Sequence, residues 1–353
     1  MPLQVIEETD PLTSLIQFRT SAVFETIVSL QNLLGTRRHR AWAEEARAAL
    51  PAAFLDELNA IYTPFGEGTM LFEVALDYPD LDDVPGFIQH VQAMDPMTFL
   101  FYVMGRIIPR EDIHRVGLDA PALRQMLKER YSEEYSCSYE SLPVEQIVEN
   151  PAAFQHRLAN LWQQYWEAFF CAQIDKIRPY WESGIAAKEA ILTRDGGRAL
   201  YEHVTGKPDL PPELPPGHPI TQVVFIPLYL IRNRVLMFYG YGNVTIFFDS
   251  ERTESHTEEI ERTKEEALGT LRALSDGTRL NILRLIARME GQIHGKMIAA
   301  KLDLSASAVS RHLALLKEGG LIVEEPHDNR ITYRLQKEAI TTLPDKVLDF
   351  LYS

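Results

Sequence analysis

The sequence predicts a mainly α-helical chain with minor β-structure, divided into two units. Apolar residues recur at helical spacing through most of residues 10–205, which predicts a large helical unit. Three runs rich in Val, Ile, Phe and Tyr follow between residues 221 and 249, which predicts short strands at the end of this unit. The C-terminal part of the chain instead has the pattern of helix, tight turn, helix and two short strands. We place the boundary in the charged linker, giving units 1–255 and 256–353.

Composition limits the class of protein. A chain of 353 residues with 46% hydrophobic residues is long enough for two domains with their own cores. Only two cysteines are present, Cys137 and Cys171, so we expect no disulfide framework and a reducing, cytoplasmic location. The N-terminal residues lack the features of a signal peptide. The longest uncharged apolar run, 219–231, has 13 residues and is too short to cross a bilayer, so no membrane association is expected.

The net charge of −15 is unevenly distributed. Residues 260–353 hold 14 Lys and Arg against 13 Asp and Glu, so the first 259 residues carry a net charge of −16. The C-terminal unit is therefore close to neutral, which is less basic than a typical nucleic-acid-binding domain. If it binds nucleic acid, its affinity must depend on a few well-placed contacts and on dimerisation.

Helix signals run through the N-terminal unit. A short strand at 3–7 is expected first, and then a helix over 10–34 that Asp10 caps and Pro11 begins. The basic run Arg37-Arg38-His39-Arg40 is interpreted as a solvated helix start rather than a nucleic-acid patch. A break is expected at 195–197 and a proline-rich connector at 205–219. The further predicted helices are 42–50, 52–61, 86–94, 96–107, 121–133, 144–148, 151–177 and 183–192.

The predicted helix 151–177 carries a wide aromatic stripe. Such stripes normally pack into a core. Some of these rings could instead line a cavity for a small apolar or aromatic effector, and both interpretations stay open at this point. The candidate effector-binding residues are Trp162, Tyr165, Trp166 and Phe169.

The C-terminal pattern begins with a short helix at 296–302 and a break at 303–305. Ser305 is placed to cap the second helix, 306–318, which should end at Gly319 with a positive φ angle. Its apolar residues Val309, Leu313 and Leu316 form one stripe. Short hydrogen-bonding side chains and one guanidinium occupy the other face, which suits insertion into the major groove of DNA. These outward residues are Ser307, Ser310, Arg311 and Ala314.

Two short strands follow, joined by a polar turn at 326–329. Asn329 tolerates the left-handed backbone of a hairpin turn, and Arg330 lies beside it. In the second strand, Ile331, Tyr333 and Leu335 should share one face and Thr332 and Arg334 the other. The chain ends in an apolar helix that needs a partner, with Ile340, Leu343, Val347, Leu348 and Leu351.

The segments LSDGTRLNIL (274–283) and LSASAVSRHLALLKEGGLI (304–322) resemble ArsR-type winged helix-turn-helix repressors. The resemblance covers residues 267–335. At Gly277 the family commonly has proline, but Asp276 can still cap the helix. The resemblance implies a transcriptional repressor that binds double-stranded DNA as a homodimer. In the family, the helices that flank the winged unit form the dimer. The candidate DNA-binding residues are Ser305, Ser307, Ser310, Arg311, His312, Asn329 and Arg330; packing remains an alternative role for His312.

Metal sensing and catalysis are not expected. Many regulators of this type bind metals through cysteines on the first helix of the motif, but 296–302 has no cysteine. The terminal helix has Asp345 and Asp349 but no histidine. No glycine-rich phosphate loop, G-x-S-x-G or H-E-x-x-H motif is present, so we predict no enzyme, metal or cofactor. Two alternatives remain: an enzyme with an appended winged helix, and a protein-interaction module whose winged helix no longer binds DNA.

Overall fold

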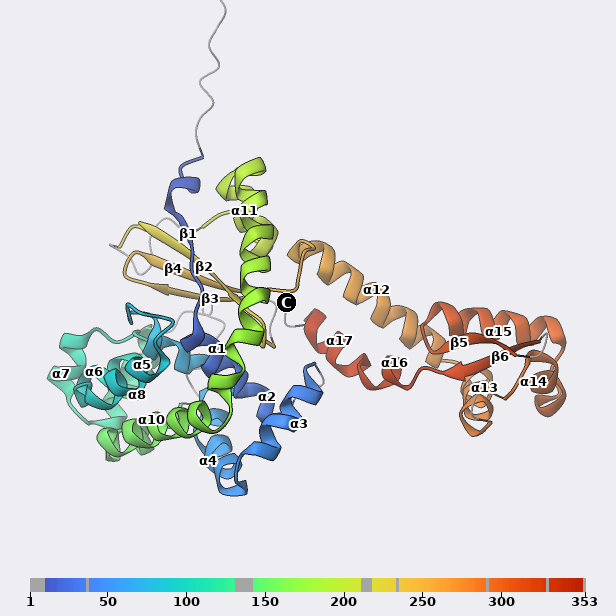
Figure 1. Ribbon diagram of the computed structural model, residues 1–353, viewed down its shortest axis with the longest axis horizontal. Helices are drawn as coiled ribbons and strands as arrows, with labels where there is room; N and C mark the ends of the chain where they lie inside the picture. Colours follow the sequence, from blue (N-terminus) through green and yellow to red (C-terminus); the bar gives the residue numbers. More distant parts are fainter. Residues whose placement is uncertain are drawn as a thin grey trace, which may run out of the picture. The chain divides into compact units, whose positions relative to one another are not determined.

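The computed structural model describes residues 10–35, 38–130, 142–210, 218–232, 235–289, 292–327 and 330–351 (Figure 1). The chain forms two compact units, Met1–Thr253 and Glu254–Ser353, so the boundary falls inside the charged linker. The prediction of a mainly α fold with minor β-structure is confirmed. The predicted strand at 3–7, Arg37, Cys137 and Asn329 lie outside the described residues.

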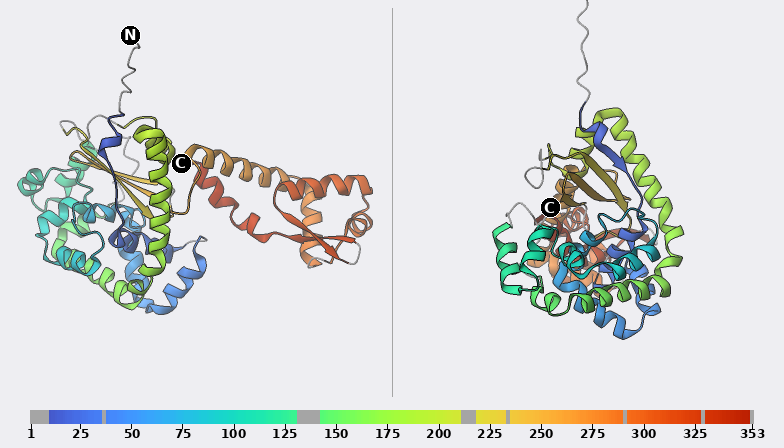
Figure 2. Two further views of the ribbon diagram at one scale, coloured as in Figure 1. Left: turned by 45° about the horizontal axis from the view of Figure 1, so that its top comes forward. Right: turned by 90° about the vertical axis from the view of Figure 1, so that its left-hand side faces the viewer.

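A four-stranded mixed sheet organises part of the N-terminal unit. Its strands lie in the order β1-β2-β4-β3, with β1, β2 and β4 parallel and β3 antiparallel to β4. The long helix α11 packs against β2 (Figure 2). Tyr241 and Gly242 make the β3–β4 turn with positive φ angles of 46° and 89°, which matches a two-residue hairpin turn. The strand bounds are β1 Ile16–Phe18, β2 Gln222–Leu228, β3 Val235–Gly240 and β4 Asn243–Asp249.

The predicted helix over 10–34 is wrong in its first half. Asp10 accepts the N–H of Leu12 at 3.1 Å, but the element it starts is only a 3-10 turn, Thr13–Leu15. Strand β1 follows, because Ile16–Phe18 pairs with Val223–Phe225 of β2. This distant pairing overrides the local helical pattern. The helical part is α1 Ala22–Ser29 and α2 Gln31–Leu34.

Most other predicted helices of this unit are present. The expected continuous helix 151–177 is divided by a 3-10 turn at Phe170–Ala172. The break expected at 195–197 is a kink within α11, where Gly196 has φ 86°. The helix bounds are α3 Arg40–Ala49, α4 Ala52–Tyr62, α5 Val84–Ala93, α6 Pro96–Val103, α7 Arg110–Val116, α8 Ala120–Arg130, α9 Val144–Glu149, α10 Pro151–Ala168 and α11 Ile174–Thr205.

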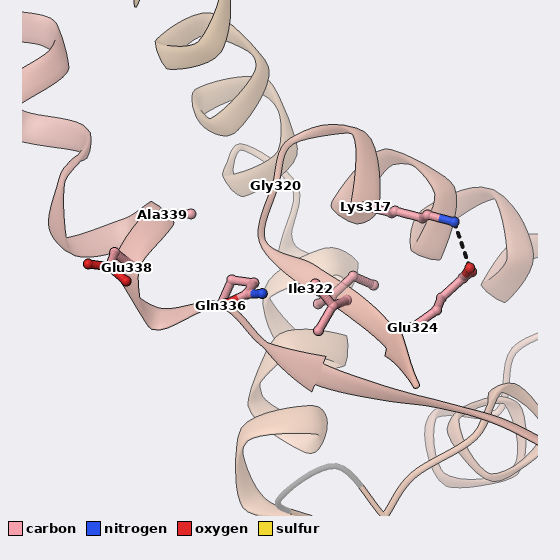
Figure 3. A pocket seen from close by; sticks show the side chains of 8 residues that line it. Lys317, Gly320, Ile322, Glu324, Gln336, Glu338 and Ala339 are labelled. Atoms are coloured by element: carbon pink, nitrogen blue, oxygen red, sulfur yellow. Dashed lines mark hydrogen bonds and ion pairs between the residues drawn. The ribbon is translucent and has the colours of Figure 1, made fainter. Parts of the chain in front are cut away.

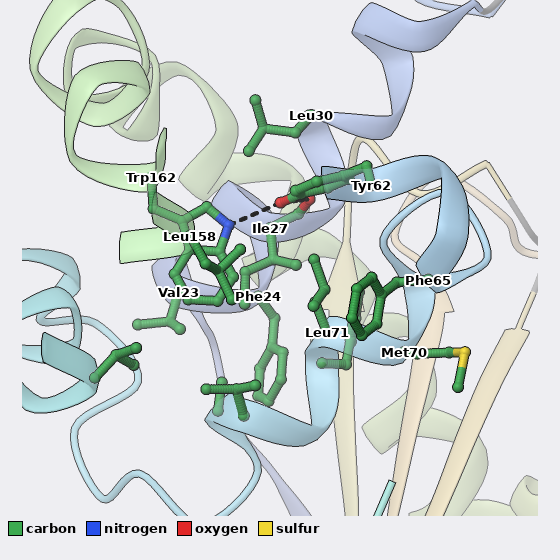
Figure 4. Packing of buried hydrophobic residues seen from close by; sticks show 14 of the residues in the cluster. Val23, Phe24, Ile27, Leu30, Tyr62, Phe65, Met70, Leu71, Leu158 and Trp162 are labelled. Carbon is green, nitrogen blue, oxygen red and sulfur yellow. Dashed lines mark hydrogen bonds between the residues drawn. The ribbon is translucent and has the colours of Figure 1, made fainter. Parts of the chain in front are cut away.

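The main core of this unit is rich in aromatic rings (Figure 4). Trp162 of α10 is fully buried, and its indole N–H donates to the hydroxyl of Tyr62 on α4 at 2.8 Å. That hydroxyl donates to the carbonyl of Ile27 on α1 at 3.3 Å. The core therefore satisfies these buried polar atoms internally while it joins three helices.

The basic run was interpreted as solvated, but Arg38 is instead held in ion pairs. Its guanidinium donates to both carboxylate oxygens of Asp249 and, at 3.0 Å, to Glu251. The Asp249 side chain is fully buried at the end of β4, and it also accepts from Arg252 at 2.7 Å. We call these four residues the Asp249 clamp. The sequence could not show this pairing, because Arg38 and Asp249 lie 211 positions apart.

The C-terminal unit has its own smaller core, built around Ile282, Ile298, Val309 and Leu316. Ser255 begins its first helix with a capping box, in which the side chains of Ser255 and Glu258 each accept the other's backbone N–H. The element bounds are α12 His256–Leu274, α13 Gly277–Arg288, α14 Gly295–Leu302, α15 Ala306–Glu318, β5 Ile322–His327, β6 Arg330–Leu335, α16 Lys337–Thr341 and α17 Leu343–Leu351.

A buried carboxylate ties three elements of the N-terminal unit together. Glu25 on α1 accepts the backbone N–H groups of Tyr229 and Leu230, at 2.9 and 2.7 Å, and the indole N–H of Trp181 on α11 at 2.6 Å. Burial raises the pKa of Glu25 to about 7, and this effect outweighs the three N–H donors, which act to lower it. The folded state therefore binds a proton here that the unfolded state releases near pH 4.3.

This shift predicts a pH-dependent stability. A raised carboxyl pKa contributes stability that is complete below the unfolded value and is lost as pH rises through about 7. We expect Glu25→Gln to reduce the fall in unfolding free energy between roughly pH 5 and 7 by up to about 1.4 kcal/mol per pH unit. Urea unfolding followed by tryptophan emission measures this. Glu73 has a similarly raised pKa and keeps its share of the slope. An unchanged slope in Glu25→Gln would contradict the assignment.

Candidate nucleic-acid interface

The turn between α14 and α15 is fixed by local backbone geometry. Asp303 ends α14 in the left-handed conformation, with φ 53°, and the N–H of Leu304 donates to Ala299 at 3.0 Å. Ser305 then caps α15 as predicted, because its hydroxyl accepts the N–H of Ala308 at 3.2 Å. The second helix spans Ala306–Glu318, the range expected from the sequence.

The two faces of α15 are sorted as predicted. Val309, Leu313 and Leu316 are buried against the core of the unit. The predicted contact residues Ser305, Ser307, Ser310 and Arg311 are all exposed. One face thus anchors the helix, and the other presents hydroxyl groups and a guanidinium to solvent.

Arg311 has no carboxylate partner within the described part of the chain. Two nearby cations are paired: Lys317 donates to Glu324 at 2.6 Å and Arg334 to Glu325 at 2.5 Å. Lys296 and Lys301 on α14, which were not predicted as contact residues, are also exposed and lack an acidic partner among the residues described. The sequence could have indicated them, because no Asp or Glu lies three or four positions from either lysine. These three cations keep their charge for an external anion.

His312 is half-buried rather than exposed. Its Nδ1 atom is buried and has no hydrogen-bond partner among the residues that the structure describes. The ring lies near the cap of α13, where the N–H of Arg279 donates to Asp276 and lowers the pKa of that carboxyl, with a smaller contribution from His312. Packing and DNA contact therefore both stay predictions for this residue.

The glycine pair after α15 works differently from the expectation. Gly319 has φ −74°, and the positive angle belongs to Gly320, with φ 69°. Gly319 is needed for close packing instead, because a Cβ atom there would lie 2.6 Å from the Cβ of Ala273 on α12. The second glycine supplies the left-handed turn into β5.

In the wing hairpin, burial along β6 does not follow its two faces. Ile331 is 52% exposed, whereas Thr332 is 6% exposed. The reason is a neighbour on the outer side of β6: the N–H of Tyr333 donates to Ile293 at 3.1 Å, and His294 forms a bridge with Thr332. Pro326 and His327 belong to β5 rather than to the turn.

Arg330 begins β6 and is exposed. Its Nη1 atom lies 3.4 Å from Nε2 of His294, a residue that the sequence analysis did not select. The other predicted turn residue, Asn329, lies outside the described residues.

The candidate effector residues are brought together, but as packed rings. Trp162, Tyr165 and Phe169 are buried, and Trp166 is half-buried. The Tyr165 hydroxyl is 2.8 Å from that of Ser29, and its ring stacks on Phe170. This favours the packing interpretation, and an effector role stays a prediction.

Two open grooves lie elsewhere. One, of about 590 Å³, lies beside β5 and α16, where the Lys317–Glu324 ion pair spans its rim (Figure 3). The other, of about 400 Å³, lies at the end of β1 and is lined by residues such as Arg19, Asp80 and Glu189. Neither groove is lined by the candidate effector or DNA-binding residues.

Within the described ranges, no group of three or more His, Cys, Asp or Glu residues is placed to hold a metal ion. Nor does any helix in those ranges have the length and apolar character needed to cross a membrane.

The helix-turn-helix and wing are similar in sequence to known proteins. Residues 276–331, from the cap of α13 into β6, match the MarR family model. The HTH-type transcriptional regulator YgaV of Escherichia coli is 33% identical over 85 residues, which cover 24% of this chain and 85% of YgaV. The chain belongs to the HTH-type transcriptional regulators. The winged helix and its relatives thus support a DNA-binding transcriptional regulator.

Two further relatives of this regulator have more specific names. The arsenical resistance operon repressor of Escherichia coli is 36% identical over 76 residues, covering 22% of this chain and 63% of that protein. The HTH-type transcriptional regulator CmtR of Mycobacterium tuberculosis (strain H37Rv) is 40% identical over 73 residues, covering 20% and 60%. The chain thus spans less than two thirds of the length of these two relatives.

The cap of α15 provides a test of the regulator's orientation on DNA. Ser305→Ala should lower the unfolding free energy by about 1 kcal/mol through loss of the cap. Ser305→Asp keeps an acceptor and suits the helix dipole, but it adds a negative charge where a phosphate would lie. We expect it to keep its stability and to bind duplex DNA more weakly. Thermal unfolding and fluorescence anisotropy with a labelled duplex measure the two effects. If Ser305→Asp bound DNA like wild type, the start of α15 would not face DNA.

Proposed function

We propose that this protein is a homodimeric repressor of the ArsR type that binds a specific DNA operator. The observation that carries the proposal is the sorted surface of α15, with an anchored apolar face and an exposed face bearing Ser307, Ser310 and Arg311. A helix of this kind fits the major groove, where serine hydroxyls and a guanidinium can read base edges. Lys296, Lys301 and Arg330 would contact phosphates beside it.

The ArsR type is supported by the motifs at 274–283 and 304–322 and by the identity to the arsenical resistance operon repressor. That relative's name also supports repression rather than activation. We do not expect a soft metal to release the protein from DNA through the thiolate site usual in this family, because α14 carries no cysteine; Cys137 and Cys171 remain the alternative pair.

Exposed apolar side chains support dimerisation through α12 and α17. Leu268 and Leu271 on α12 are 38% and 44% exposed, and Leu348 and Leu351 on α17 are 50% and 63% exposed. Lys346 of α17 donates to Glu266 of α12 at 2.6 Å, which fixes the two helices together within one chain. A second copy would remove these side chains from water.

The N-terminal unit is proposed to sense a small apolar or aromatic effector beside Trp162 and Trp166. Support comes from its size, which exceeds what dimerisation requires, and from its dense aromatic core. Because the rings are packed, the effector would have to bind a state in which they separate. It can shift the protein only by its differential affinity for the two states.

The role of Arg311 is testable with a matched arginine. Arg311→Ala should weaken operator binding by about 1–3 kcal/mol if the side chain contacts a base, or lower the salt slope by about one unit if it contacts only phosphate. Arg334→Ala removes the same charge from a guanidinium already paired with Glu325 and should have a much smaller effect. Titrations at several salt concentrations measure both. Equal affinity of wild type and a folded Arg311→Ala protein would exclude α15 as the reading helix.

Dimerisation is tested by introducing charge on α17. Leu348→Asp combined with Leu351→Asp should yield monomers at micromolar concentration, because two carboxylates would be buried at the interface. Leu118→Asp, at an exposed leucine of the other unit, is the control and should leave the dimer intact. Sedimentation gives the state, and binding to half-sites about 10 base pairs apart should be lost with the dimer. A dimer that survives both substitutions would place the interface elsewhere.

Effector sensing is tested by tryptophan emission of the full chain. A ligand from a panel of apolar and aromatic compounds should change the emission saturably and lower operator affinity over the same concentrations. Trp166→Phe should reduce the emission change, because Trp166 is the half-buried indole of the pair. If no compound shifts either signal, the core is structural only.

A further inference from the structure

The second strand of the wing is held by a residue that also begins the helix-turn-helix motif. His294 bridges to Thr332 in β6, and its preceding residue accepts the N–H of Tyr333 at 3.1 Å. The carbonyl of His294 accepts the N–H groups of Met297 and Ile298 at 3.0 and 3.2 Å, which starts α14. Hydrogen bonds therefore hold the backbone of His294 on both sides. They fix the position from which its half-buried side chain extends.

The imidazole of His294 faces Arg330. The Nη1 atom of Arg330 lies 3.4 Å from Nε2 of the ring. A guanidinium can only donate, so in this contact Nε2 is the acceptor and the ring proton belongs on Nδ1. The contact joins the first residue of β6 to the start of α14.

This partner differs in kind from those of the neighbouring cations. Lys317 and Arg334 are held by the carboxylates Glu324 and Glu325. A carboxylate neutralises a cation and competes with a DNA phosphate for it. An imidazole that accepts through Nε2 orients the guanidinium without adding a negative charge, so the positive charge stays available. Arg330 has no carboxylate partner within the residues that the structure describes.

We propose that His294 is a positioning residue for DNA binding, which holds Arg330 of the wing ready for a backbone phosphate. The proposal rests on the DNA-binding function proposed above. An exposed arginine loses considerable side-chain entropy when it is fixed on a ligand. A partner that already restricts the side chain in the free protein lowers this cost on binding.

The experiment compares His294→Ala, His294→Gln, Arg330→Ala and the Ala/Ala double variant in the full chain. The probe is a mixed-sequence duplex of about 30 base pairs, because a phosphate contact needs no operator sequence. Affinity is measured over a range of salt concentrations. His294→Ala should weaken binding about 3–10-fold, and the amide oxygen of Gln, which can also accept, should restore most of it.

The remaining variants separate positioning from a structural role. Arg330→Ala should lower the salt slope by about one unit, and adding His294→Ala to it should change nothing further. Thermal unfolding of each variant checks the fold. The proposal is overturned if Gln and Ala lose affinity equally, if His294→Ala binds like wild type, or if the two alanine effects simply add. If wild type itself does not bind the duplex, DNA binding fails as the function and the positioning role fails with it.

Discussion

The junction that leads out of the N-terminal unit depends on one buried carboxylate. Asp249 has a fully buried side chain at the end of β4, and a charge in that position is tolerated only when it is paired and hydrogen-bonded. Arg38 and Arg252 supply this pairing, and the N–H of Glu251 donates to the same carboxylate at 3.1 Å. The clamp thereby holds together the segment before α3, the last strand of the sheet and the start of the linker. Removal of either arginine would leave part of this charge uncompensated.

Long-range pairing explains what the sequence could not show in the N-terminal unit. Strands β2, β3 and β4 were predictable, because each is a run of β-branched and aromatic residues. Strand β1 has three residues, and it exists because Ile16 pairs with Val223, some two hundred positions away. The Asp249 clamp is hidden for the same reason. From sequence alone, a basic run next to a helix start is interpreted as solvent-exposed, because its distant carboxylate partner is not known.

The DNA-binding unit was more predictable because its determinants are local. The period of apolar residues and the Ser305 cap together define α15, and they lie within fifteen residues or so of one another. The wing was less predictable. Alternation alone gave the two faces of β6 but not the burial of Thr332, which lies beside Ile293 and His294. The same neighbouring segment brings His294 to Arg330, so one long-range contact accounts for both the buried Thr332 and the overlooked His294.

Charge pairing describes the DNA-binding side better than net charge does. The C-terminal unit is nearly neutral, yet its carboxylates are not spread evenly among its cations. Three of those on α12 and the hairpin are occupied: Glu266 by Arg262 and Lys346, Glu324 by Lys317 and Glu325 by Arg334. The motif and the wing retain the cations without acidic partners named above. A unit that is nearly neutral overall gains little from a general field, and each phosphate contact contributes about one counterion to the binding equilibrium. Its affinity must therefore depend on how well each cation is held in place before DNA arrives.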